Sequence, residues 1–178
     1  TKAFEVMTSR TINPDVEVEV MLEAAHKLAV ATGDSGMVGG QYADLKAEGV
    51  GFDENTVSFI HLNKTAALIS YCTELGALLG YADENGKRDM KDFGKKIGLA
   101  FQIIDDILDI TSSSEELGKN AKSDLKKDKA TYPAIYGIDK SKKIADELIE
   151  SAFTILDKYG EAANPLRELA RFVVERNN

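Results

Sequence analysis

The stretch that decides the fold lies near the middle of the chain and reads Gly98-Leu99-Ala100-Phe101-Gln102-Ile103-Ile104-Asp105-Asp106-Ile107-Leu108-Asp109-Ile110. Its polar side chains stand at positions 102, 105, 106 and 109, the spacing of one helical face, and every other position from 99 to 110 is apolar. An ordinary surface helix has a wide polar face, so this pattern predicts a helix that is buried nearly all round and carries one narrow acidic seam. We expect this helix to span residues 90–111, with Asp89 as its N-cap.

The acidic seam is costly, and its chemistry indicates a metal ion. Asp is a mediocre helix former, and three like charges within about one turn repel one another. The seam also stands at the expected C-terminal end of the helix, where the macrodipole disfavours anions. Carboxylate oxygens are the ligands of hard divalent ions such as Mg²⁺, which would offset these costs. We therefore predict a metal site at Asp105, Asp106 and Asp109. A solvated acidic face is disfavoured, because apolar residues flank the acids on both sides.

The composition favours one helical domain. Of the 178 residues, 43% are hydrophobic and 29% are charged, which is typical of a soluble globular protein. Only three prolines occur, and long runs carry no turn signal. We expect a single all-α domain over residues 1–178, with no convincing strand and no transmembrane segment. The net charge of −8 argues against nucleic acid as a main partner, although metal ions and lysines can still mediate contacts with anions.

Turn signals divide the rest of the chain into further helices. Asn13-Pro14 offers an N-cap followed by proline at the first helical position, and Gly33 ends that helix. Lys64-Thr65 stands at the expected start of a long helix, where free N–H groups favour anions. Residues 112–128 form a polar, lysine-rich connection. We expect helices at 1–9, 14–32, 36–48, 53–62, 66–81, 141–159 and 164–176, and a short one opened by 129–133.

The cysteine and histidine residues are expected to be structural. Cys72, the only cysteine, excludes an intrachain disulfide and fits a reducing cytoplasm. It follows Tyr71 in an apolar helix, so we interpret it as an inert core residue. His26 and His61 lie on separate helices without a local partner at metal-ligand spacing. Each is interpreted as a surface or packing histidine.

Lysines supply the expected complement to the acids. The Lys64 ammonium beside the Thr65 hydroxyl suits a phosphate oxygen, although a solvated lysine next to an N-terminal threonine fits the same pattern. Spacing does not choose among the later lysines, namely Lys119, Lys122, Lys126, Lys127 and Lys129. Gln102 is either a pocket residue or a core amide bonded to backbone. Gly36-Met37-Val38-Gly39-Gly40 lacks a preceding strand, which excludes a dinucleotide-binding fingerprint.

Residues 98–109 resemble the second aspartate-rich motif, Asp-Asp-x-x-Asp, of the trans-prenyl diphosphate synthases. Other segments are similar to blocks of that family and follow in the family's order: GMVGGQYADL at 36–45, HLNKT at 61–65, Gly118-Lys119, Ser123-Asp124 and DKATYP at 128–133. The set looks most like the short-chain bacterial farnesyl or geranylgeranyl diphosphate synthases. The resemblance implies an isoprenoid synthase-type helical bundle around a central cavity.

The resemblance also implies a reaction and a set of roles. Isopentenyl diphosphate would condense with an allylic diphosphate, dimethylallyl or geranyl, after Mg²⁺-assisted ionisation to an allylic cation. Asp105 would be the main ligand among three Mg²⁺ ions, with Asp106 and Asp109 bound directly or through water and Asp124 supporting the metal shell. Lys64, Lys119 and Lys129 would bind the allylic diphosphate. Thr65 and Gln102 would lie near the reacting carbons, and Gln41 and Asp44 would line the same cavity. A cytoplasmic homodimer is implied.

One departure from the family leaves alternatives open. The family's first aspartate-rich motif and the basic residues that bind isopentenyl diphosphate would precede Thr1, and none of Asp15, Asp34 or Asp53 stands in such a motif. We therefore interpret the chain as the C-terminal portion of the synthase, missing the N-terminal helices, and expect it to be inactive alone. A non-catalytic subunit or binding module of the same fold is an alternative. A terpene cyclase is disfavoured by the intact triple Asp. The residues shown do not define product length.

Overall fold

The computed structural model describes residues 1–116 and 129–175, with side chains for 1–111 and 129–175. Within those ranges every regular element is a helix, which confirms the predicted all-α class. The elements are α1 (Lys2–Thr8), α2 (Val18–Thr32), α3 (Met37–Ala47), α4 (Glu54–His61), η1 (Leu62–Ala66, one π-helical turn), α5 (Ala67–Leu79), α6 (Glu84–Glu116), α7 (Tyr132–Tyr136), α8 (Ile138–Leu156), η2 (Asp157–Ala163, 3₁₀) and α9 (Asn164–Glu175).

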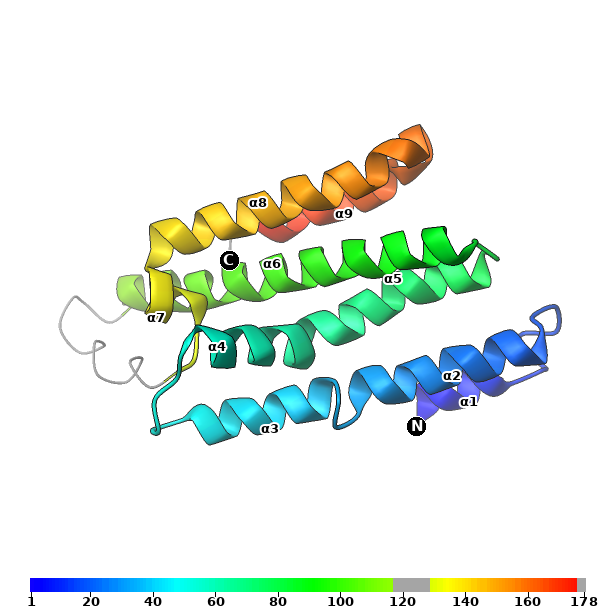
Figure 1. Ribbon diagram of the computed structural model, residues 1–178, viewed down its shortest axis with the longest axis horizontal. Coiled ribbons are helices and arrows are strands. Elements are labelled where there is room, and N and C mark those ends of the chain that lie inside the picture. The colour runs from blue at the N-terminus through cyan, green and yellow to red at the C-terminus, as the bar shows by residue number, and fades with distance from the viewer. Residues whose placement is uncertain (117–128, 176–178) are drawn as a thin grey trace.

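Helix α6 runs through the middle of the bundle. Figure 1 shows α8 and α9 on one side of it, and α4 and α5 beside it. The pair α2 and α3, with α1 alongside α2, lies beyond α4 and α5. α6 packs mainly on α5 and α8, and it also contacts η1 and α9. The acidic, otherwise apolar segment at residues 98–110 therefore lies in the central helix of the structure.

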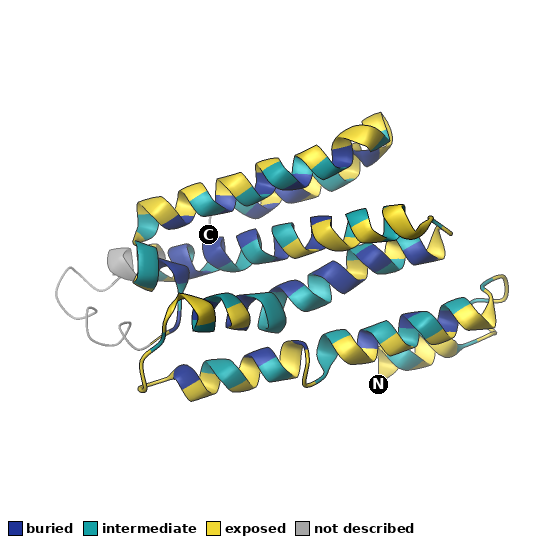
Figure 2. Ribbon diagram, viewed as in Figure 1, coloured by how far each residue is buried: buried dark blue, intermediate teal, exposed yellow. Residues whose placement is uncertain are grey.

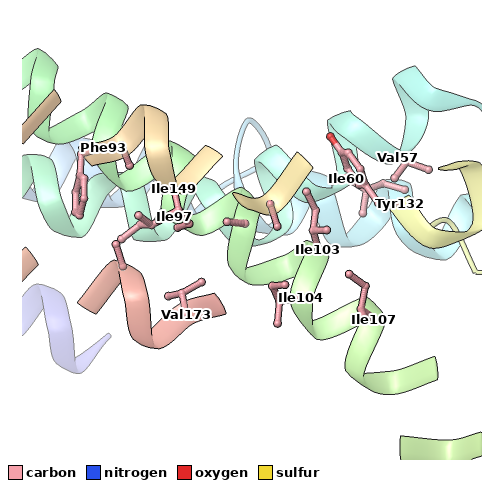
Figure 3. Packing of buried hydrophobic residues seen from close by; sticks show 14 of the residues in the cluster. Val57, Ile60, Phe93, Ile97, Ile103, Ile104, Ile107, Tyr132, Ile149 and Val173 are labelled. Carbon is pink, nitrogen blue, oxygen red and sulfur yellow. The ribbon is translucent and has the colours of Figure 1, made fainter. Parts of the chain in front are cut away.

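The core follows the apolar faces of α6. Figure 2 shows buried positions gathered where α6 meets its neighbours, and Figure 3 shows the side chains involved. Phe93 and Ile103 are fully buried, and burying a side chain of that size stabilises a fold by about 1.5–3 kcal/mol. Ile149 and Val173 reach the same cluster from α8 and α9. The prediction that this helix is largely buried is confirmed.

Both ends of α6 differ from the prediction. The helix begins at Glu84, and the Asp83 carboxylate accepts a hydrogen bond from the Gly86 N–H at 2.8 Å. Asp89, the expected N-cap, instead accepts from the Tyr159 hydroxyl at 2.5 Å and pairs with Lys158. At the other end α6 continues to Glu116. The aspartates therefore stand well inside the helix, and the expected penalty from its C-terminal dipole is wrong, because that effect is confined to the last turn.

Two other predicted helix starts are also wrong. Helix α2 begins at Val18, because the Asn13 side chain donates to Val6 O and Ser9 O, at 2.7 and 3.2 Å, and closes the end of α1. Elements α4, η1 and α5 form one continuous helix, since no glycine or proline interrupts the chain between Asp53 and Leu75. Lys64 and Thr65 therefore lie in the middle of a helix and not at its start, so the free N–H groups that we expected there are not present.

Two glycines bring neighbouring helices against η1. A Cβ atom on Gly40 of α3 would lie 2.2 Å from the Lys64 backbone nitrogen. A Cβ on Gly98 of α6 would lie 2.7 Å from the Ala66 Cα. No side chain fits at either position, so both helices approach the η1 backbone closely. This close approach gathers residues of α3, η1 and α6 into one region.

Candidate active site

A groove of about 380 Å³ opens between α3 and η1. It is lined by Met37, Val38, Gln41, Lys64 and Thr65. Its floor is partly apolar, and the polar groups come from Gln41 on α3 and from the two η1 residues. The structure therefore brings together three side chains for which the sequence predicted a substrate-binding or catalytic role.

An ion pair joins α3 to η1 beside this groove. The Lys64 Nζ lies 2.6 Å from the Asp44 Oδ2, and both side chains are partly buried. Asp44 stands one turn after Gln41 on α3, so the helix presents both residues toward η1. The pair holds the Lys64 ammonium at the groove, in reach of an anion that can compete with the Asp44 carboxylate.

A chain of hydrogen bonds leads from the groove into the bundle. The Thr65 hydroxyl donates to Gln102 Oε1 at 2.7 Å, and Gln102 Nε2 donates to Asp106 Oδ1 at 3.0 Å. The His61 Nε2 lies 3.2 Å from the other carboxylate oxygen, Asp106 Oδ2. Asp106 Oδ2 has no hydrogen-bond partner among the described residues, so this contact is close but is not a hydrogen bond. These hydrogen bonds link η1 to α6.

The three aspartates of the seam have different surroundings. Asp106 is 8% exposed and faces Gln102 and His61. Asp105 is half-buried, whereas Asp109 is exposed one turn later. Among the residues with described side chains, no group of three or more His, Cys, Asp or Glu gathers closely enough to hold a metal ion by itself. The oxygen-only donor set at Asp105 and Asp109 has the chemistry that suits Mg²⁺.

His61 contributes more than its sequence context indicated. Its side chain is 3% exposed and stacks on Tyr132 of α7, with ring centroids 5.1 Å apart, so the packing interpretation is correct. The sequence did not reveal its contact with Asp106, because that partner comes from a distant helix. The available signal was its position one helical turn before Thr65, in the same 61–65 segment.

Helix α7 packs against α4, α6 and α8 and brings Tyr132 onto the His61 ring. Thr131 caps it by accepting from the Ala134 N–H at 3.2 Å, as the predicted short helix requires. Burial raises the pKa of the Tyr132 hydroxyl. A hydrogen bond with Glu54, aided by desolvation, raises the pKa of Tyr136 to about 12. Both phenols are therefore neutral groups at physiological pH and act as packing and hydrogen-bonding residues.

Other predicted residues lie away from this groove or beyond the described chain. Lys129 is exposed just before α7 and is not among the groove-lining residues. Lys119 and Asp124 fall in 117–128, outside the described residues, so their predicted roles have no structural account here. His26 is exposed, as expected. Cys72 is exposed rather than in the core, although adjoining atoms desolvate its sulfur and raise the pKa of the thiol.

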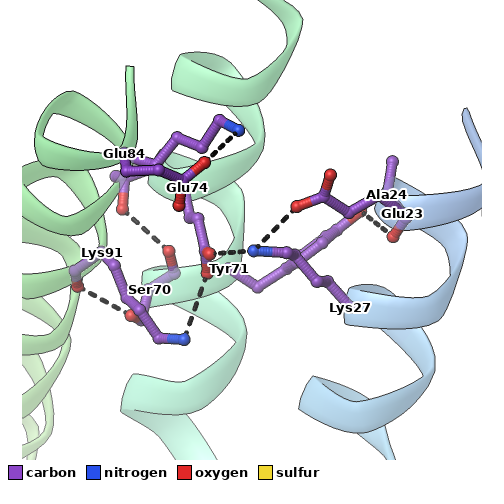
Figure 4. A network of polar contacts seen from close by, with 10 residues as sticks. Glu23, Ala24, Lys27, Ser70, Tyr71, Glu74, Glu84 and Lys91 are labelled. Carbon is purple, nitrogen blue, oxygen red and sulfur yellow. Dashed lines mark hydrogen bonds and ion pairs between the residues drawn. The ribbon is translucent and has the colours of Figure 1, made fainter. Parts of the chain in front are cut away.

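A second polar cluster, which the sequence did not predict, lies between α2, α5 and α6. Glu74 is buried and pairs with Lys27 of α2 and with Lys91 of α6, the latter at 3.4 Å (Figure 4). Next to it the Tyr71 hydroxyl donates to Ala24 O at 3.0 Å. These residues border a cavity of about 540 Å³. Because each carboxylate oxygen of Glu74 has a cationic neighbour, from α2 or from α6, the cluster serves to join three helices.

Comparison with known proteins finds relatives that align along nearly the whole chain. The chain is 42% identical over 179 aligned residues to the geranylgeranyl diphosphate synthase of Cyanophora paradoxa, covering 99% of this chain and 58% of that protein. It is 39% identical over 180 residues to a protein named heterodimeric geranylgeranyl pyrophosphate synthase large subunit 1, chloroplastic, from Arabidopsis thaliana, covering 99% of this chain and 48% of that protein. The chain spans about half the length of the curated relatives it matches.

Solved structures agree with these sequence relatives. A farnesyl/geranylfarnesyl diphosphate synthase from Zymomonas mobilis, in its apo form, superimposes with a TM-score of 0.82 at 35% identity, over 97% of this chain and 56% of that one. A geranyltransferase from Helicobacter pylori, complexed with magnesium and isoprenyl diphosphate, gives 0.74 at 29% identity over 97% and 55%. The sequence model of the polyprenyl synthetase family matches residues 2–165. With the groove, the Asp-rich central helix and these likenesses together, the chain belongs to the polyprenyl synthetase family.

Proposed function

We propose that this chain forms part of a prenyltransferase that condenses isopentenyl diphosphate with an allylic diphosphate. The observation that carries the proposal is the 2.7 Å hydrogen bond between Thr65 and Gln102. It joins the HLNKT segment to the FQIIDDILD segment, and Thr65 lines the same groove as Lys64. An ammonium for a diphosphate and neighbouring dipoles for a cation are the groups that an ionising allylic diphosphate requires.

The acidic seam supplies the proposed metal site. Asp105 is the main Mg²⁺ ligand in this proposal, and Asp109, one turn later, binds directly or through water. Asp106 acts through water at most, because its oxygens face Gln102 and His61. Asp124 supports the metal shell. Support comes from the Helicobacter pylori neighbour, which is described as complexed with magnesium and isoprenyl diphosphate. These residues would hold Mg²⁺, three ions in the complete enzyme we propose, which would neutralise the negative charge of the diphosphate leaving group.

The reaction then follows from groups on this chain. The bond between the allylic C1 and the diphosphate oxygen breaks, and its electron pair leaves with the diphosphate, which Lys64, Lys119 and Lys129 hold. Thr65 and Gln102 lie near the allylic cation that remains. The double bond of isopentenyl diphosphate attacks C1 and forms the new carbon–carbon bond. The resulting tertiary cation loses a proton from C2 to a diphosphate oxygen, which restores a double bond. Gln41 and Asp44 line this cavity.

We propose farnesyl or geranylgeranyl diphosphate as product, and the relatives named geranylgeranyl synthases support the longer one. A homodimer located in the cytoplasm remains part of the proposal. Among the described residues, no helix combines the length and apolar character that a membrane crossing needs. A second candidate is a subunit that works with a catalytic partner, which the Arabidopsis relative named as part of a heterodimer supports. A terpene cyclase is disfavoured by the intact Asp105-Asp106-Ile107-Leu108-Asp109.

Mass spectrometry of reaction products tests the proposal. The complete protein, given Mg²⁺, dimethylallyl diphosphate and isopentenyl diphosphate, is expected to make a prenyl diphosphate of fifteen or twenty carbons, whereas residues 1–178 alone make none. Lys64→Ala should lower kcat/KM by about a hundredfold or more, because an ammonium on the leaving group is lost. The matched control Lys46→Ala, on the exposed side of α3, should behave like the wild type. A complete protein that forms no product, alone or with a partner, contradicts the proposal.

A further inference from the structure

The hydrogen bonds from Thr65 to Asp106 have a fixed direction, and charge sets it. An ionised carboxylate only accepts hydrogen bonds, so the group of Gln102 that faces Asp106 must be its NH₂. The amide oxygen of Gln102 then faces Thr65, at 2.7 Å, and the Thr65 hydroxyl must donate to it. Because a hydroxyl has one proton, Thr65 keeps only oxygen lone pairs for any other neighbour. Those lone pairs remain for the groove that Thr65 lines.

The His61 ring lies against this carboxylate, at ion-pair distance from Asp106 Oδ2 but without an aligned hydrogen bond to it. The ring stacks on Tyr132 and is almost fully buried, so it has little freedom to rotate. Its Nε2 lies 3.2 Å from Asp106 Oδ2, while Gln102 takes Oδ1. Within the described part of the chain, its Nδ1 has no hydrogen-bond partner. Among the described side chains, the polar group that the structure places against this ring is the Asp106 carboxylate.

We propose that His61 and Asp106 are positioning residues that orient the Gln102 amide, so that the Thr65 hydroxyl presents an oxygen lone pair, rather than a proton, to the groove. The catalytic consequence rests on the proposed prenyl transfer. An oxygen lone pair stabilises a developing allylic cation, whereas a hydroxyl proton in the same place repels it. The gain arises only when the charge develops, so losing it lowers kcat and leaves KM for the allylic diphosphate unchanged.

A double-mutant cycle in the complete protein tests this coupling. Asp106→Asn keeps the shape but can donate, so the Gln102 amide can reverse and the Thr65 hydroxyl can turn its proton to the groove. We expect kcat to fall on the order of tenfold to a hundredfold with KM unchanged. In a Thr65→Val background, which has no hydroxyl to orient, the same substitution should lower kcat by a clearly smaller factor, because only an effect through metal-bound water would remain. Equal losses in the two backgrounds would overturn the proposal.

Two variants of His61 form a matched pair. His61→Gln places an amide nitrogen near the position of Nε2, whereas His61→Asn is shorter and falls near Nδ1. Both lose the ring that stacks on Tyr132, so the difference between them reports the contact with Asp106. We expect His61→Gln to keep kcat within about threefold and His61→Asn to lose on the order of tenfold. Equal kcat values for the two variants would contradict a positioning role.

Neutron diffraction reads the hydrogen-bond direction without any turnover. In crystals of the complete, metal-free protein exchanged into D₂O, the Thr65 deuteron should lie on the line to Gln102 Oε1. The Gln102 deuterons should lie on the nitrogen that faces Asp106. A Thr65 deuteron that points into the groove, or a reversed Gln102 amide, would overturn the inference. Should the complete protein lack prenyl transfer, the proposed function fails, and the neutron structure still decides this point.

Discussion

Replacing Gly40 by alanine should separate α3 from η1. The new Cβ would lie 2.2 Å from the Lys64 backbone nitrogen and 2.7 Å from its Cα. Both are backbone atoms that cannot rotate away, so α3 must retreat by about 1 Å to restore ordinary contact. Overpacking of this kind costs about 1–3 kcal/mol, so the free energy of unfolding should fall by about 2–3 kcal/mol. The same retreat lengthens the 2.6 Å pair between Asp44 and Lys64.

Urea unfolding of the complete protein measures the first effect, and steady-state kinetics measures the second. A displacement of about 1 Å at a catalytic site can cost a hundredfold in rate, so we expect kcat/KM to fall by on the order of a hundredfold. Gly76→Ala is the matched control, since nothing lies within 4 Å of its Cβ and it stands inside α5. That variant should be more stable by about 0.5–1 kcal/mol. A Gly40→Ala protein as stable and active as the wild type would refute the close approach.

Three further predictions concern polar contacts that hold the helices of the bundle together. Glu74→Ala leaves Lys27 and Lys91 without their buried partner and should lower the free energy of unfolding by about 1–3 kcal/mol. Glu84→Ala, at an exposed pair with Lys87, should leave it nearly unchanged in the same urea titration. Hydrogen bonds from Lys158 and Tyr159 lower the pKa of Asp89 below its ordinary 3.8, so its contribution to stability is present above that pH and is lost as the pH falls through the folded-state pKa. Asp89→Asn should therefore be less stable than the wild type at pH 7, and equal stability at pH 7 would contradict this. Arg167→Lys loses the forked contacts to Gly160 O and Leu156 O and should lower the melting temperature by a few degrees, while Arg171→Lys, at an exposed pair with Glu168, should not.

The central helix was predictable because its pattern depends only on local spacing. A helix whose residues are apolar on every face but one is predicted to be buried on those apolar faces, and Phe93 and Ile103 are indeed in the core. Its boundaries were less predictable, since both Asp83 and Asp89 have the chemistry of an N-cap. Asp83 caps the helix, while Asp89 is taken by Lys158 and Tyr159 from a segment much later in the chain. Such a choice depends on tertiary contacts that local sequence does not contain.

The candidate site was predictable in its members and less so in its connections. Spacing indicated an acidic seam, and the resemblance to a family supplied Lys64, Thr65 and Gln102. The hydrogen bond from Thr65 to Gln102 and the contact between His61 and Asp106 join segments that meet only in the folded bundle. Local spacing also treated the aspartates alike, whereas packing buries Asp106 and leaves Asp109 exposed.

A crystal structure of the complete protein with Mg²⁺ and an unreactive thio-analogue of an allylic diphosphate tests the central claim most directly. The proposed site predicts an Asp105 oxygen about 2.0–2.1 Å from a Mg²⁺ ion. It also predicts the Lys64 ammonium on a diphosphate oxygen and the allylic C1 beside Thr65 and Gln102. A diphosphate bound elsewhere, for instance in the cavity beside Glu74, with Asp105 and Asp109 away from any metal, would contradict the account.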